Sequence, residues 1–146
     1  MGLPVPSDDA ARADAKLYAA SRESGREARF RLTVVPAYDY ICALTGYRCV
    51  IDDAGHIHQF ADSRNNDPRN GIALCKNAHW LFDQGLWSLT DDYRVLIAAS
   101  RFDEAGDDSH QLKRLEGCKV RLPANPDHWP DTAHLAWHRR HKLRAG

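Results

Sequence analysis

The segment from residue 71 to residue 86 constrains the fold most strongly, because an apolar run leads almost directly into an amphipathic helix. Residues 71–75 (Gly-Ile-Ala-Leu-Cys) form a short apolar run and predict a buried strand. Residues 77–84 predict a compact helix, with Asn77 as its N-cap and Gly85 as its stop. Because so few residues separate the predicted strand from the predicted helix, the way in which the two elements pack is constrained.

The predicted helix has two separable faces. Its apolar stripe recurs at helical spacing and consists of Ala78, Leu81, Phe82 and Gly85. His79 and Asp83 are an i, i+4 pair on a neighbouring face. Two side chains with metal-ligand chemistry therefore project together from one helix.

A histidine upstream extends this pattern toward a catalytic site. His56 is expected at the end of a strand, followed by a long polar loop that leads to Asn70 and the strand and helix above. We expect this order to bring His56 close to His79. Phosphodiester hydrolysis needs a base that activates water and a cation that stabilises the developing charge, and a histidine facing a metal-binding helix supplies both.

At this point the sequence resembles the HNH endonuclease family. Four ordered blocks carry the resemblance: Cys42-Ala-Leu-Thr-Gly46, Asp53-Ala-Gly-His-Ile-His-Gln-Phe60, Asn70-Gly-Ile-Ala-Leu-Cys75 and His79-Trp-Leu-Phe-Asp-Gln-Gly-Leu86. The resemblance covers roughly Phe30 to Ile97. A single block would say little, whereas the ordered set is specific.

The resemblance implies an α+β fold with a ββα-metal (HNH) core. We expect a flanking hairpin after the helix, built from residues 86–89 and 93–97. The organisation predicted is an N-terminal helical lead-in at 1–29, an HNH nuclease core at 30–100, and a C-terminal extension with a basic helix at 101–146.

The resemblance also implies roles for the three signature residues. His56 would be the general base, which requires a neutral ring, the normal state of histidine at neutral pH. Asn70 would hold the loop through hydrogen bonds from its side chain to the backbone, although Asn70-Gly71 is also a typical tight turn. His79 would be a metal ligand, and the alternative for it is a surface histidine on a helix.

The remaining metal ligands are less clearly marked. Asp83 would support the site one turn after His79, or it could simply tie down the end of the helix. Many relatives carry an acid or histidine directly before the base, whereas this chain has Gly55 there. Asp53 is therefore the candidate for that ligand. The set would take one divalent ion, Mg²⁺ or Mn²⁺, and affinity would also favour Ni²⁺ or Zn²⁺.

DNA would be bound by local patches, since 20 basic and 20 acidic residues leave no overall field. The last predicted helix, capped by Asp131 and running from Thr132 to about residue 143, offers Arg139, Arg140 and Lys142 to phosphates. The alternative is a solvated terminal helix. A second basic patch precedes the core and consists of Arg22, Arg26, Arg29 and Arg31.

The leading hypothesis is a DNA endonuclease of restriction or defence, in the cytoplasm and not in a membrane, with a homodimer attractive for cutting both strands. No apolar run is long enough to span a bilayer. One alternative is a catalytically silent DNA-binding module with an HNH fold, which Gly55 makes conceivable. Another is a structural zinc domain using Cys42 and Cys75, although no C-x-x-C pair is present.

Overall fold

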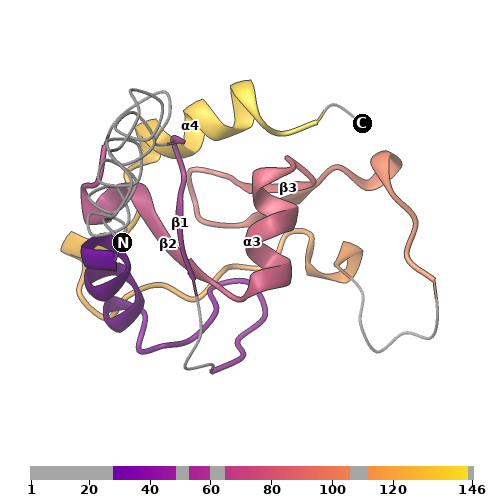
Figure 1. Ribbon diagram of the computed structural model, residues 1–146. Coiled ribbons are helices and arrows are strands. Elements are labelled where there is room, and N and C mark those ends of the chain that lie inside the picture. Colours follow the sequence, from indigo (N-terminus) through magenta and orange to yellow (C-terminus); the bar gives the residue numbers. More distant parts are fainter. Residues whose placement is uncertain (1–27, 49–52, 60–64, 106–111, 145–146) are drawn as a thin grey trace, which may run out of the picture.

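The computed structural model describes residues 28–48, 53–59, 65–105 and 112–144. These residues form an α+β fold of two small antiparallel sheets, each of two strands, with helices packed against them (Figure 1). The predicted fold class is confirmed. The predicted lead-in at 1–29 lies almost entirely outside the described residues. Among the described residues no helix is long and apolar enough to cross a membrane.

The first sheet pairs β1 (Asp53–His56) with β2 (Gly71–Leu74) in antiparallel register, Asp53 opposite Leu74 and His56 opposite Gly71. All four residues of β2 are buried, because this apolar run lies at the centre of the fold. Both strands form where the sequence predicted them. The strand that ends at His56 therefore has a fixed partner.

Helix α3 (Lys76–Asp83) follows β2 directly and buries Ala78 and Phe82. Its N-cap is Cys75, not Asn77 as predicted, and Cys75 makes no capping hydrogen bond through its side chain. The helix begins earlier because the chain turns as soon as β2 ends. Gly85 stops the helix as predicted, with φ of 71°.

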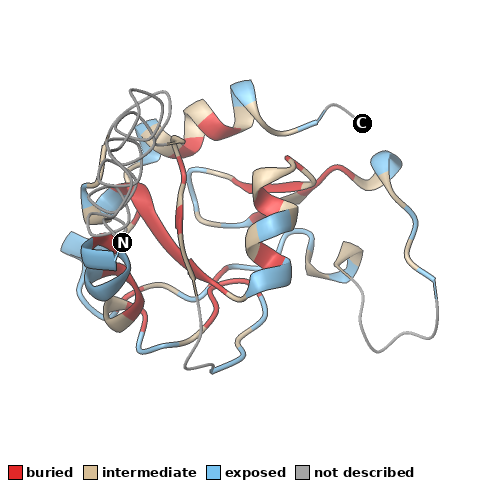
Figure 2. Cartoon of the chain, viewed as in Figure 1, coloured by how far each residue is buried: buried red, intermediate tan, exposed pale blue. Residues whose placement is uncertain are grey.

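The predicted hairpin is present as β3 (Trp87–Leu89) paired with β4 (Val95–Ile97). It is fastened to α3 by Trp87, whose Nε1 donates to the carbonyl of Ala78 over 3.0 Å. Figure 2 shows that β2, β3 and the inner face of α3 are buried together. The core therefore lies between α3 and the two strand pairs, β1–β2 and β3–β4.

Residues 28–37 are helical, so helical structure extends beyond residue 29, where the predicted lead-in ends. Phe30, Val34 and Val35 of this segment are buried in the core. Gly71 makes the close approach possible, because a Cβ there would lie 2.8 Å from Cζ of Phe30 and would collide with Val34. The segment covers the face of the first sheet opposite α3.

At the C-terminal end, α4 (Thr132–His141) packs on β3 and buries Leu135 and His138. Asp131 caps it as predicted, its Oδ1 accepting from the amide of Ala133 over 2.9 Å. Four short 3₁₀ turns complete the described chain: η1 (Pro68–Asn70), η2 (Ala99–Arg101), η3 (Lys113–Leu115) and η4 (Pro126–His128).

In the C-terminal extension the sequence also predicts a short helix at residues 111–116 and a short strand at residues 119–122. The short helix expected at 111–116 is the single turn η3. The strand expected at 119–122 makes only one bridge, from Lys119 to Arg94. Too few residues of either segment are apolar and buried to extend them.

Candidate functional site

The first sheet and α3 bring His79 onto β1. A Cβ on Gly55 would lie 3.1 Å from Cδ2 of His79 and 3.2 Å from its Nε2, so the imidazole rests directly on this glycine. Asp53 lies two residues before Gly55 and faces the same side of the strand. The helix histidine and the strand acid therefore meet on one face of β1.

The imidazole of His79 lies between two carboxylates. Its Nδ1 is 3.2 Å from Oδ2 of Asp53, and its Nε2 is 3.2 Å from Oδ2 of Asp83, one helical turn away. Lys76 pairs with the other oxygen of Asp53, at 3.0 Å. All three predicted metal-ligating residues, His79, Asp83 and Asp53, are thus in direct contact.

These contacts shift the protonation equilibria of the site. The hydrogen bond to Asp83 raises the pKa of His79, and the contacts with Asp53 add to this effect while burial opposes it. Burial raises the pKa of Asp53, but the hydrogen bonds from His79 and Lys76 outweigh it, so the pKa of Asp53 is lowered. The protonated ring of His79 and the carboxylate of Asp53 thus stabilise each other's charged forms.

His56 faces the opposite side of the strand. It is opposite Gly71 in the register, and its ring stacks on Phe30 with centroids 4.0 Å apart and planes 6° apart. Adjacent strand residues point to opposite faces, so the backbone of β1 separates His56 from His79, which rests on Gly55. The prediction that the two histidines face each other is therefore corrected: they flank one strand.

Asn66 contacts His56 but was not identified from the sequence, because it lies in a polar loop without periodicity. Its Oδ1 is 2.8 Å from Nε2 of His56. An amide oxygen only accepts hydrogen bonds, so Nε2 of His56 is the donor and the lone pair of the neutral ring is on Nδ1. Asn66 thereby selects the tautomer of His56.

Asn70 is fully buried and closes the loop between the two strands. Its Oδ1 accepts from the amide of His58 over 2.8 Å, and its Nδ2 donates to the carbonyls of His58 and Asn65 over 2.9 and 3.0 Å. The ring of His58 in turn stacks on Trp137 of α4, with centroids 3.9 Å apart. The backbone that follows His56 is therefore held from two directions.

The three basic residues predicted to contact DNA differ in their surroundings. Arg139 donates to the carbonyl of Leu89 and to Asp91, both over 2.8 Å, so its guanidinium ties α4 to the hairpin. Arg140 is exposed, and Lys142 is half-buried at the C-cap of α4. Arg140 presents its charge to solvent most openly.

The two cysteines considered for a zinc site are neighbours at the start of α3. Burial raises the pKa of the Cys75 thiol, and the adjacent Cys42 thiol adds to this shift. Among the residues that the structure describes, no three His, Cys, Asp or Glu side chains gather to hold a metal ion, here or around His79. Cys49 lies outside the described residues.

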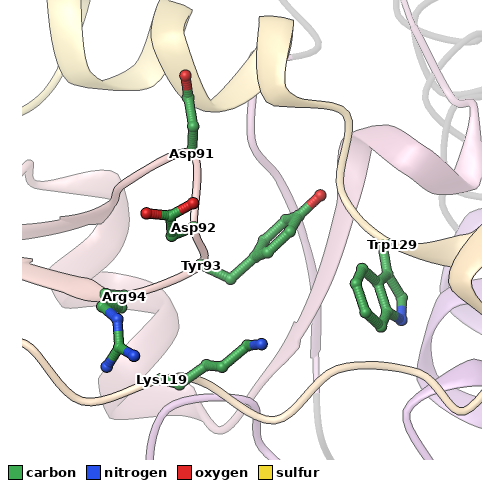
Figure 3. A pocket seen from close by; sticks show the side chains of 6 residues that line it. All are labelled: Asp91, Asp92, Tyr93, Arg94, Lys119 and Trp129. Atoms are coloured by element: carbon green, nitrogen blue, oxygen red, sulfur yellow. The ribbon is translucent and has the colours of Figure 1, made fainter.

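Two hollows mark the described surface near these elements. The larger, about 340 Å³, lies at the turn between β3 and β4 and contains none of the predicted site residues (Figure 3). It is lined by Asp91, Asp92, Tyr93, Arg94, Lys119 and Trp129. The smaller, about 220 Å³, is lined by two residues that touch His56, namely Phe30 and Asn66.

An antiparallel strand pair is backed by a helix, with one histidine at the end of the first strand and another on the helix. This is the ββα arrangement that the sequence resemblance implied. Residues 42–90 match the family model of the HNH endonucleases. Residues 42–90 of the chain therefore resemble an HNH endonuclease domain. The resemblance seen in the sequence is confirmed.

A solved structure, that of the modification-dependent TagI restriction endonuclease, has a similar fold, with a TM-score of 0.55 and 22% sequence identity. The likeness covers 77% of this chain but only 37% of that one. No curated protein matches the chain.

Proposed function

We propose that the protein is a metal-dependent DNA endonuclease that hydrolyses phosphodiester bonds in the restriction of foreign DNA. One observation carries the proposal: His79 rests on Gly55 between the carboxylates of Asp53 and Asp83, on the strand that ends at His56. A proton acceptor and a set of cation ligands thus flank a single strand. Hydrolysis of a phosphodiester requires both.

A divalent ion beside His79 would have two protein ligands, the imidazole and one carboxylate. Each nitrogen of the imidazole already has a carboxylate within 3.2 Å, so one nitrogen with its carboxylate would hold the ion. The other carboxylate would accept the ring's remaining N–H and orient it, as partners of metal-bound histidines commonly do. When bound, the ion would stabilise charge on the phosphate and on the leaving oxygen.

The ligand types favour some divalent ions over others. Carboxylates suit Mg²⁺ and Mn²⁺, and the imidazole adds affinity for Mn²⁺, Ni²⁺ or Zn²⁺. With only one or two carboxylates and one imidazole, water and phosphate oxygens would complete the coordination shell. We expect Mn²⁺ to support activity at least as well as Mg²⁺.

His56 is assigned the general base. The imidazole of His56, positioned by Asn66 at 2.8 Å, would accept a proton from water as the water oxygen bonds to phosphorus. The bond from phosphorus to the 3′-oxygen would then break and leave a 5′-phosphate. Asn70 acts through position, because it fixes the backbone that follows the base.

DNA binding is assigned to the basic end of α4. Arg140 and Lys142 would contact phosphates, and Arg139 would contribute through its position beside them. A homodimer would supply two sites, as cutting both strands requires. We place this activity in the cytoplasm, where restriction enzymes meet incoming DNA.

Dependence on modified bases belongs to the same proposal. The structural neighbour is a modification-dependent restriction endonuclease, and this chain covers 37% of it. We therefore include modified DNA among the substrates to be tested.

A catalytically silent DNA-binding module is the second candidate, and Gly55 is the observation that favours it. Glycine offers no ligand at the position directly before His56, where many relatives have one. The two candidates differ in one measurable property, which is cleavage.

The test is incubation of the purified protein with supercoiled plasmid, plain or carrying modified cytosines, in Mn²⁺, in Mg²⁺ and in EDTA. His56→Ala and His79→Ala are compared with His128→Ala, which removes an exposed histidine in η4. We expect metal-dependent nicking or linearisation that only the first two substitutions abolish. A folded wild-type protein that binds but never cuts either plasmid would support the silent module instead.

A further inference from the structure

A groove of about 220 Å³ lies beside His56, between the helical residues 28–37 and the loop that precedes β2. The helix contributes Arg29, Phe30 and Thr33, and the loop contributes Asn66 and Pro68. Two of these residues define its position relative to His56. Phe30 stacks on the ring, and Asn66 holds its Nε2 at 2.8 Å.

The lining of the groove favours a sugar and a phosphate over a base. Phe30 is buried and has one face against His56, so it offers little surface for stacking a base. Arg29 is exposed at the rim and, among the lining residues that the structure describes, carries the only formal charge. The hydroxyl of Thr33 is held by a 3.0 Å hydrogen bond to the carbonyl of Arg29 and can still accept another.

We propose that this groove binds the sugar–phosphate unit of DNA next to the scissile phosphate, with the guanidinium of Arg29 paired to its phosphate. The inference rests on the proposed function, which puts the scissile phosphate within reach of His56. The next unit of the same strand must then lie beside His56, and this groove is the hollow in contact with it. Arg29 is thus a binding residue, and Phe30 and Asn66 connect the groove to the base.

The test compares Arg29→Ala with Arg31→Ala, because both remove one exposed arginine from the same helix and only Arg29 lines the groove. Binding of a fluorescently labelled duplex is measured in EDTA across a range of salt concentrations. For Arg29→Ala we expect affinity to fall about three- to tenfold and the salt slope to fall by about one, as for loss of one phosphate contact. Cleavage in Mn²⁺ should show a raised KM with kcat little changed.

The outcomes separate this inference from the proposed function. Equal losses in Arg29→Ala and Arg31→Ala would mean a diffuse charge effect and would overturn the groove. An Arg29→Ala protein that cuts and binds like wild type would overturn the groove and leave the nuclease standing. A wild-type protein that neither binds nor cuts DNA would overturn both. Circular dichroism of each variant checks that the helix is retained.

Discussion

The hydroxyl of Ser88 lies 2.7 Å from Nδ1 of His138, and both residues are buried. Nε2 of His138 is 3.1 Å from the carbonyl of Phe82, which can only accept, so Nε2 donates and Nδ1 accepts from Ser88. The ring also stacks on Phe82, with centroids 3.7 Å apart. A neutral histidine therefore joins α4, β3 and the end of α3.

This buried histidine predicts that acid weakens the fold. Burial lowers the pKa of His138 to about 4. An unfolded histidine titrates near about 6.5, so between these values the unfolded chain binds more protons and the free energy of unfolding falls as pH is lowered. His138→Gln retains a donor and an acceptor but cannot titrate. From pH 7 to pH 4.5 the wild type should lose about 2 kcal/mol more than this variant in urea unfolding; parallel profiles would contradict the assignment.

The contact between Gly55 and His79 predicts a loss of activity without a loss of fold. In Gly55→Ala the new methyl would lie about 3.1 Å from the ring, so the imidazole must shift by a few tenths of an ångström. Misplacing a catalytic group by about 1 Å can cost a hundredfold, so we expect nicking in Mn²⁺ to slow by about tenfold. Initial rates are read from plasmid gels, and thermal unfolding checks the fold. An unchanged rate would show that His79 need not hold this position.

The two carboxylates beside His79 predict graded effects on metal binding. Asp53→Asn and Asp83→Asn should each weaken Mn²⁺ binding by about ten- to a hundredfold, with the direct ligand causing the larger loss. Lys76→Ala should strengthen it about two- to fivefold, because an ammonium group that neutralises Asp53 is removed. Free Mn²⁺ is measured by electron paramagnetic resonance. Asp92→Asn, an exposed acid in the hairpin turn, is the control, and equal affinities in all four variants would contradict the site.

The arginines of α4 predict two different phenotypes. Arg139→Ala should lower the free energy of unfolding by about 1–2 kcal/mol, because its hydrogen bonds to Leu89 and Asp91 are lost. Arg140→Ala and Lys142→Ala should leave stability within about 0.5 kcal/mol and each reduce the salt slope of DNA binding by about one. Urea unfolding and fluorescence anisotropy separate the effects. A slope reduced only in Arg139→Ala would reverse the assignment.

The central part of the fold could be predicted because local pattern and burial agree there. The apolar run that forms β2 and the stop at Gly85 specify the same elements in sequence and structure. The helical segment at 28–37 was harder, because Phe30, Val34 and Val35 have only modest helix propensity. Packing against the first sheet determines their conformation. A short stretch of sequence does not reveal such tertiary packing.

The candidate site was predictable in its residues more than in its geometry. Asp53 was identified by elimination, and its contact with His79 follows from alternation along β1. The same alternation, applied one residue further, separates His56 from His79. Asn66 carries no pattern, since a loop amide gains a role only from where the chain returns.

The buried amide of Asn70 would allow the stretch that it anchors to vary in length. One side chain fastens both His58 and Asn65, so the stretch between these two positions begins and ends at the same anchor. Insertions or deletions between His58 and Asn65 would therefore leave His56 and Asn66 where they are.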